Sequence, residues 1–139
     1  MDNAATTRRA YQLINAGDLD GFGELVADDF AEHDETAGFA PTKEGVLELF
    51  HMYRAAFPDL QLHAEEVLVS EDKTITRARA TGTHQGEFMG MPATGKRVAV
   101  QVIDIMRFGE DGLVREHWGL FDALGMMRQL GAIPAPAPA

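Results

Sequence analysis

The chain contains no cysteine. Disulfide bonds, thiolate nucleophiles and zinc sites with cysteine ligands are therefore excluded. Basic residues are also scarce, because 12 lysines and arginines stand against 22 acidic side chains and give a formal net charge of −10. Affinity for phosphates requires a basic surface, so we expect no nucleic-acid partner.

Long apolar runs and nucleotide-binding motifs are missing too. No segment approaches the roughly 20 apolar residues that a membrane span needs, and residues 1–12 lack the apolar stretch of a signal peptide. The chain has no G-x-G-x-x-G, no P-loop and no G-x-S-x-G elbow. Nucleotide-dependent, flavin-dependent and serine-nucleophile chemistry therefore have no support, and we expect a cytoplasmic protein that uses no cofactor.

What is present suffices for one packed domain. The chain has 139 residues, of which 45% are hydrophobic, and a domain of this size can bury a sizeable core. We expect a single domain over residues 1–133. Proline and alanine alternate in residues 134–139, which indicates a disordered tail.

Apolar residues in the first half recur at helical spacing. The pattern predicts three helices and one brief extended segment: a helix over 6–16, a short helix over 19–26, an extended segment over 30–34, and a helix from its cap at Thr42 to Phe57.

The second half alternates in the manner of strands. We predict strands over 60–69, 74–84, 96–108 and 113–120, with tight turns at 70–73 and 110–112, and a final helix that Asp122 caps and that ends near Leu130. Helices followed by an antiparallel meander are typical of an α+β domain, in which helices cover one face of a curved sheet.

The strand over 96–108 is apolar on both faces. Val98 and Val100 lie on one face, and Ile103 and Ile105 lie on the other. An antiparallel sheet in a monomer normally leaves one face polar. We therefore expect one face to line a core or cavity and the other to meet a second subunit, in a homodimer or a higher homo-oligomer.

Asp104 is isolated within this apolar strand. A buried carboxylate without a partner is costly, so such a residue either pairs with a cation or works as an acid or base. The structural alternative is an ion pair with Arg107, Arg77 or Arg79, or a side chain that faces solvent.

The last strand carries Glu116, His117 and Trp118. Strand alternation allows either His117 or Trp118, but not both, to face a cavity. Histidine has an ordinary pKa of about 6.5 and is a natural general base; a hydrogen-bonded core histidine is the structural alternative. A turn centred near residue 111 would place Asp104 opposite Trp118 and within diagonal reach of His117.

Four other histidines are scattered along the chain, namely His33, His51, His63 and His84. No pair of them has the H-x-x-x-H spacing of a helical metal site, and we expect no bound metal. His84 ends a strand beside an apolar loop, where it could sit at the mouth of a pocket.

The loop over 85–95 contains Phe88, Met89 and Met91. Methionine adapts to irregular shapes, so the loop favours binding of a flat or greasy ligand, although these residues could equally cap the sheet as ordinary core. Asp122 follows the last strand and invites a catalytic role, but capping the final helix explains it better.

Several segments have the order and spacing of a known family over nearly the whole chain. They are Ala56–Leu60, Gly82–Lys96, Met106–Trp118 and Arg128–Gly131. Together they resemble the SnoaL-like polyketide cyclases, also called ester cyclases. The resemblance implies a nuclear-transport-factor-like cone, in which helices fold around a strongly bent antiparallel sheet and enclose an apolar cavity.

The resemblance also implies a mechanism. In the family's cyclases a cavity aspartate removes a proton next to a carbonyl of a polyketide ester, and the enolate closes a ring by aldol attack without metal or cofactor. The family's aspartate falls at Gly119 in this chain, and a second family histidine falls at Asp104. This chain therefore departs from the cyclase pattern at both positions.

Three functions follow as alternatives. In the first, Asp104 is the base of a small cofactor-independent cyclase, isomerase or lyase that acts on an apolar carbonyl compound, with His117 and His84 as acids or oxyanion donors. The second is a cofactor-free hydroxylase of aromatic polyketides, and the third is non-catalytic binding of a lipid-like or aromatic ligand. We favour the first, with these candidate substrate-binding residues: Phe50, Tyr53, Phe88, Met89, Met91 and Trp118.

Overall fold

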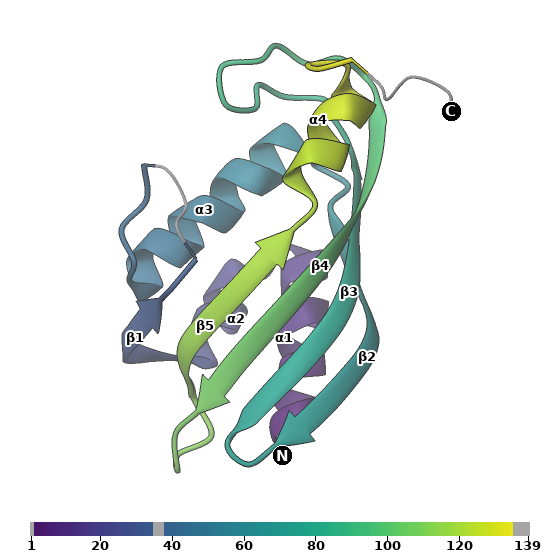
Figure 1. The fold of residues 1–139 in the computed structure, drawn as a ribbon. Coiled ribbons are helices and arrows are strands. Elements are labelled where there is room, and N and C mark those ends of the chain that lie inside the picture. The colour runs from purple at the N-terminus through teal and green to yellow at the C-terminus, as the bar shows by residue number, and fades with distance from the viewer. Residues whose placement is uncertain (1, 35–37, 135–139) are drawn as a thin grey trace.

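Four helices and five strands make up the computed structural model, which describes residues 2–34 and 38–134. In chain order they are α1 (Asn3–Ala16), α2 (Leu19–Glu24), β1 (Val26–Glu32), α3 (Lys43–Ala56), β2 (Gln61–Ser70), β3 (Lys73–Thr83), β4 (Arg97–Phe108), β5 (Val114–Phe121) and α4 (Ala123–Leu130). The helices pack on the sheet (Figure 1), and this confirms the predicted α+β class.

The N-terminal boundaries differ from the prediction. α1 begins at Asn3 because Asp2, and not Thr6, caps it; the Asp2 carboxylate accepts a hydrogen bond from the Ala5 N–H at 2.7 Å. The second helix ends at Glu24, and Val26 belongs to β1, where it pairs with Val114 of β5. Sheet pairing therefore outweighs the helical spacing of Val26.

The sheet has the order β1-β5-β4-β3-β2. Strands β2 to β5 form the predicted antiparallel meander, but β1 joins β5 in parallel and makes the sheet mixed. The expectation of a wholly antiparallel sheet was therefore wrong at this edge. The parallel pairing sets Glu32 beside His117, and the His33 N–H donates to the His117 carbonyl at 2.9 Å.

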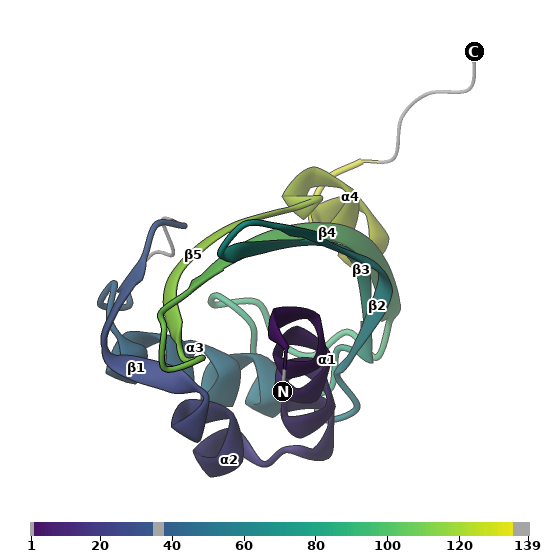
Figure 2. The same cartoon turned by 90° about the horizontal axis from the view of Figure 1, so that it is seen from below.

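The sheet is strongly curved (Figure 2), and α1, α2 and α3 close its concave side. Alternate residues of β4 face inward, so Val98, Val100 and Met106 are buried against the helices. Asp104 shares this parity and points the same way. The fold therefore places one carboxylate among apolar side chains on the concave face.

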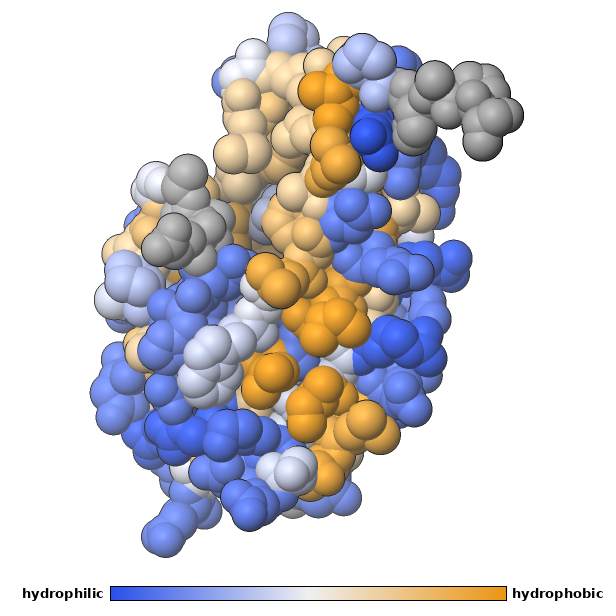
Figure 3. Space-filling model, viewed as in Figure 1, coloured by the Kyte–Doolittle hydropathy of each residue, from blue (hydrophilic) through white to orange (hydrophobic). Residues whose placement is uncertain are grey.

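The convex face carries an apolar stripe. The strand register lines up Leu68, Ile75, Ile105 and Trp118 across β2, β3, β4 and β5. Leu120 is 77% exposed, and Figure 3 shows hydrophobic side chains along the middle of this face between hydrophilic margins. The face agrees with the expected second apolar surface, and its coverage by another subunit stays a prediction.

Two further expectations concern the chain outside this core. No helix among residues 2–34 and 38–134 is long and apolar enough to cross a membrane; the cytoplasmic location stays a prediction. Residues 135–139, the greater part of the expected tail, lie outside the described residues.

The cap at α4 confirms the structural interpretation of Asp122 and yields a prediction. Its carboxylate accepts a hydrogen bond from the Gly125 N–H at 2.9 Å. We expect Asp122→Ala to lower the free energy of unfolding by about 1 kcal/mol, because an N-cap is lost, and to leave turnover unchanged. Urea denaturation measures the loss, and Asp122→Asn, which keeps a capping oxygen, is the control. A large drop in turnover at unchanged stability would contradict the assignment.

Candidate active site

An apolar cavity of about 170 Å³ lies between the helices and the concave face of the sheet. A cavity of about 150 Å³ with apolar walls can hold benzene, so this one admits at least an aromatic ring. Its apolar walls include Ile14, Phe22, Phe30, Phe50, Val100 and Val102. The ionisable side chains of its lining are Tyr11, Glu32, Asp34, Tyr53, Asp104 and His117.

Asp104 and His117 meet on one wall of this cavity. The His117 Nε2 lies 2.8 Å from the Asp104 Oδ1. The diagonal contact predicted from the hairpin is therefore confirmed, although Asp104 pairs with Gly119 and not with Trp118.

A β-bulge explains this difference of one residue. The register between β4 and β5 shifts between Arg107, which pairs with Glu116, and Phe108, which pairs with Val114. The extra residue is Arg115. Because a shift of one residue exchanges the two faces of a strand, the bulge turns His117 toward the cavity and Trp118 away from it.

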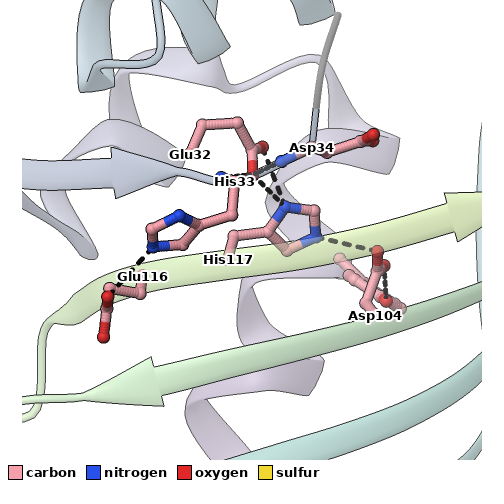
Figure 4. A network of polar contacts seen from close by, with 7 residues as sticks. Glu32, His33, Asp34, Asp104, Glu116 and His117 are labelled. Carbon is pink, nitrogen blue, oxygen red and sulfur yellow. Dashed lines mark hydrogen bonds and ion pairs between the residues drawn. The ribbon is translucent and has the colours of Figure 1, made fainter.

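A second carboxylate binds the other side of the His117 ring. The Glu32 Oε2 lies 2.6 Å from the His117 Nδ1 (Figure 4), and Glu32 comes from β1. The imidazole therefore bridges two carboxylates. Sequence reasoning missed Glu32 because its position depends on the parallel pairing of β1 with β5, between residues that lie 85 positions apart in the chain.

This bridge determines the charge of His117. Burial alone would lower the pKa of His117, but the hydrogen bonds and negative charges of Asp104 and Glu32 outweigh it and raise the pKa from 6.5 to about 10. His117 is therefore an imidazolium at neutral pH, with an N–H on each nitrogen for a carboxylate. This charge does not suit a general base, one of the interpretations of His117, whereas its expected role as an acid or oxyanion donor stays a prediction.

Tyr11 of α1 completes the surroundings of Asp104. Its O–H donates to the Asp104 Oδ2, and burial together with the Asp104 charge raises the pKa of Tyr11. Each oxygen of Asp104 thus accepts one hydrogen bond and keeps a further lone pair. The arginine ion pairs considered as the structural alternative are absent from the described residues, because Arg107 pairs with Glu116, and Arg77 and Arg79 pair with Glu65.

Asp34 is a further cavity carboxyl group that sequence reasoning missed. Burial, and then the charge of Glu32, raises the pKa of Asp34, while His117 lowers it. Burial and the charge of Asp34 likewise raise the pKa of Tyr53. Asp34 and Tyr53 therefore add a third carboxyl group and a second phenol to the cavity lining. The acidic residues on either side of His33 were the only sequence signal for Asp34.

The six predicted wall residues divide into three groups. Phe50 and Tyr53 line the cavity. Phe88 is buried in the core against Phe57 and Tyr53, and its backbone pairs with that of Met91. Neither Phe88 nor Met91 belongs to the cavity lining.

The remaining two predicted wall residues point away from the cavity. Met89 is 67% exposed and is absent from the cavity lining. Trp118 lies on the convex face and stacks on His33 at 4.7 Å between ring centroids. The bulge at Arg115 turns the Trp118 side chain to this face.

His84 is also absent from the cavity lining. Its ring is fully buried, and its Nδ1 accepts a hydrogen bond from the Thr94 N–H at 3.3 Å. It packs against Phe57 at 5.5 Å between ring centroids. The structure therefore gives His84 a place in the core under the 85–95 loop and does not bring it to the Asp104–His117 pair.

The other histidines do not gather. His33 contacts Glu116 on the convex face, His63 contacts Thr81, and His51 is exposed. Across the residues that the structure covers, no group of three histidine, aspartate or glutamate side chains is arranged to hold a metal ion.

Comparison with known proteins defines the class to which this fold and cavity belong. The family model described as SnoaL-like polyketide cyclase matches residues 4–130. The chain therefore belongs to the SnoaL-like polyketide cyclase family.

Individual relatives agree with this assignment. The chain is 32% identical to aklanonic acid methyl ester cyclase DauD of Streptomyces sp. (strain C5), over 94% of this chain and 82% of the relative. It is 30% identical to nogalonic acid methyl ester cyclase of Streptomyces nogalater, over 85% and 89%. AclR of Streptomyces galilaeus, a protein proposed to be a hydroxylase, superposes with a TM-score of 0.86 at 30% identity, over 97% of this chain and 84% of AclR.

Proposed function

We propose that this protein is a cofactor-independent cyclase that closes a ring in a neutral polyketide ester by an intramolecular aldol reaction. The observation that carries the proposal is the Asp104–His117 pair, joined at 2.8 Å on the wall of an apolar cavity. Membership of the SnoaL-like family supports the reaction class. The relatives named for methyl ester substrates support the substrate class.

The reaction divides into three steps. Asp104 accepts a proton from the carbon next to a substrate carbonyl. The resulting enolate carbon attacks a second carbonyl carbon, so a carbon–carbon bond forms and an alkoxide appears. Asp104 then returns the proton to the alkoxide oxygen. The product is an isomer of the substrate, and the electrons balance without an oxidant.

Two donors lie beside Asp104 for the charge that develops on oxygen. The imidazolium of His117 and the hydroxyl of Tyr11 both contact this carboxylate. In a cavity that excludes water, fixed donors stabilise an enolate or alkoxide far more than they would in solution. When the incoming proton neutralises the charge of Asp104, this residue holds the two donors less strongly, and the His117 N–H or the Tyr11 O–H becomes available to the substrate oxygen.

The charges around the cavity favour an ester over a free acid. Glu32, Asp34 and Asp104 contribute three carboxyl groups, His117 contributes one positive charge, and no lysine or arginine of the described chain lines the cavity. Glu32 and Asp104 already bind the imidazolium of His117. A substrate carboxylate would therefore enter without a cationic partner of its own, which is costly in apolar surroundings. Methyl esterification of the substrate carboxylate removes its negative charge.

The proposal is tested by incubating the protein with aklanonic acid methyl ester and nogalonic acid methyl ester under ¹⁸O₂. We expect a cyclised product of unchanged mass that contains no ¹⁸O. Incorporation of ¹⁸O would instead establish the hydroxylase alternative, which the similarity to AclR supports. Saturable binding of both esters without any product would establish the non-catalytic alternative and overturn the proposal.

A further inference from the structure

The missing side chain at Gly119 has a geometric consequence for the acid–base pair. Gly119 lies on β5, opposite Asp104 and two residues after His117, so all three share the concave face. A Cβ atom at this position would stand 2.7 Å from the His117 Cε1 and 2.8 Å from the Asp104 Oδ1. Both distances are shorter than real Cβ contacts, so an added methyl group requires one ring or carboxylate to move.

His117 and Asp104 each have a second hydrogen-bond partner, which is lost or weakened if the side chain moves. Glu32 holds the other nitrogen of His117 at 2.6 Å, and Tyr11 holds the other oxygen of Asp104. The relative exposure of the side chain is only 19% for His117 and 14% for Asp104. Displacement would therefore leave a buried charged group short of a hydrogen bond, which is unfavourable.

We propose that Gly119 is a positioning residue, whose lack of a side chain lets Asp104 and His117 touch and leaves the space beside the Asp104 Oδ1 open to a substrate carbon. Gly119 itself lines the cavity, so this space is continuous with the volume in which the ring would close. The inference rests on the proposed function for its catalytic meaning, but the contact it describes exists without any substrate.

The test is the titration of His117 in Gly119→Ala, followed by NMR of the imidazole resonances. The charged groups that face His117 are Asp104 on β4 and Glu32 on β1, with Asp34 nearby. Loss of the Asp104 contact should lower the pKa of His117 by about 1 to 3 units. In a cyclase assay the same variant should lose kcat more than it raises KM.

Gly82→Ala is the matched control. Gly82 also lies in the sheet and lines the cavity, but a Cβ there would meet the Phe57 Cβ at 3.1 Å and no member of the pair. We expect the titration of His117 in Gly82→Ala to match that of the wild type. An unchanged titration in folded Gly119→Ala would overturn the inference, whatever substrate the protein turns over.

A double-mutant cycle covers the case in which Gly119→Ala folds poorly. In the Asp104→Ala background the carboxylate oxygen that the methyl group would strike is gone, and Glu32 is the one carboxylate among the described residues that still holds the His117 ring. The loss of stability caused by Gly119→Ala, measured by urea denaturation, should therefore be smaller in that background. Equal losses in both backgrounds would show that the methyl group acts elsewhere and would overturn the inference.

Discussion

Asp104→Asn is expected to lower kcat for ring closure by about 10²- to 10⁴-fold, the usual contribution of a positioned general base. The amide has the size of the carboxylate, and its oxygen still accepts the hydrogen bond of Tyr11, but it cannot take a proton from carbon. Turnover of a methyl ester substrate, measured beside the thermal unfolding of each variant, gives the result.

Asp28→Asn provides the control for this substitution. It makes the same chemical change at an exposed carboxylate, which pairs with Lys43 on the surface, and it should keep wild-type turnover. A folded Asp104→Asn variant that cyclises the substrate at the wild-type rate would remove Asp104 from the mechanism.

His117→Phe is expected to lower the free energy of unfolding at pH 7 by about 3 kcal/mol. The imidazolium lies between the carboxylates of Glu32 and Asp104, and removing one partner of a buried ionic group leaves the other charges uncompensated. Urea denaturation measures the difference. His51→Gln, at an exposed position, is the control and should change stability little.

The same residue predicts how stability depends on pH. The pKa of His117 is raised from 6.5 to about 10 in the folded protein. Its contribution is therefore complete below about pH 6.5, declines as pH rises toward 10, and is lost above it, by at most about 1.4 kcal/mol per pH unit. The wild type should lose stability over this range relative to His117→Phe, and a constant difference between the two would contradict the ionic bridge.

Local sequence signals predicted most of the fold. Thr42 and Asp122 cap their helices as expected. Such caps can be predicted because the capping oxygen and the N–H that donates to it are only three residues apart. The turn at 70–73 joins β2 to β3, and alternation placed Asp104 and Val100 on one face of β4. These features depend on neighbours along the chain or across one hairpin.

The parts of the site that escaped prediction depend on distant or irregular contacts. Glu32 reaches His117 only because β1 pairs with β5 in parallel. Trp118 faces outward because of one extra residue at Arg115, which alternation alone does not reveal. Phe88 and His84 turn into the core because the 85–95 loop folds back on itself. No periodicity in the sequence encodes any of these arrangements.

The two departures from the family pattern prove to be neighbours. Gly119 and Asp104 pair directly across β5 and β4. The carboxylate therefore stands on the strand next to the one on which the resemblance placed it, and it still contacts the histidine of β5. The sequence alone left open whether a carboxylate reached the cavity, and the register of this hairpin places Asp104 on its wall.

Proton abstraction at carbon is the central claim, and exchange in D₂O isolates that step. A substrate analogue that keeps the carbonyl beside the acidic carbon but lacks the carbonyl that the enolate attacks cannot cyclise. NMR then follows only the exchange of the proton on that carbon. We predict that the wild-type protein accelerates this exchange and that Asp104→Asn reduces it to the rate in buffer. Exchange at the buffer rate with bound wild-type protein, or undiminished exchange with Asp104→Asn, would contradict the mechanism.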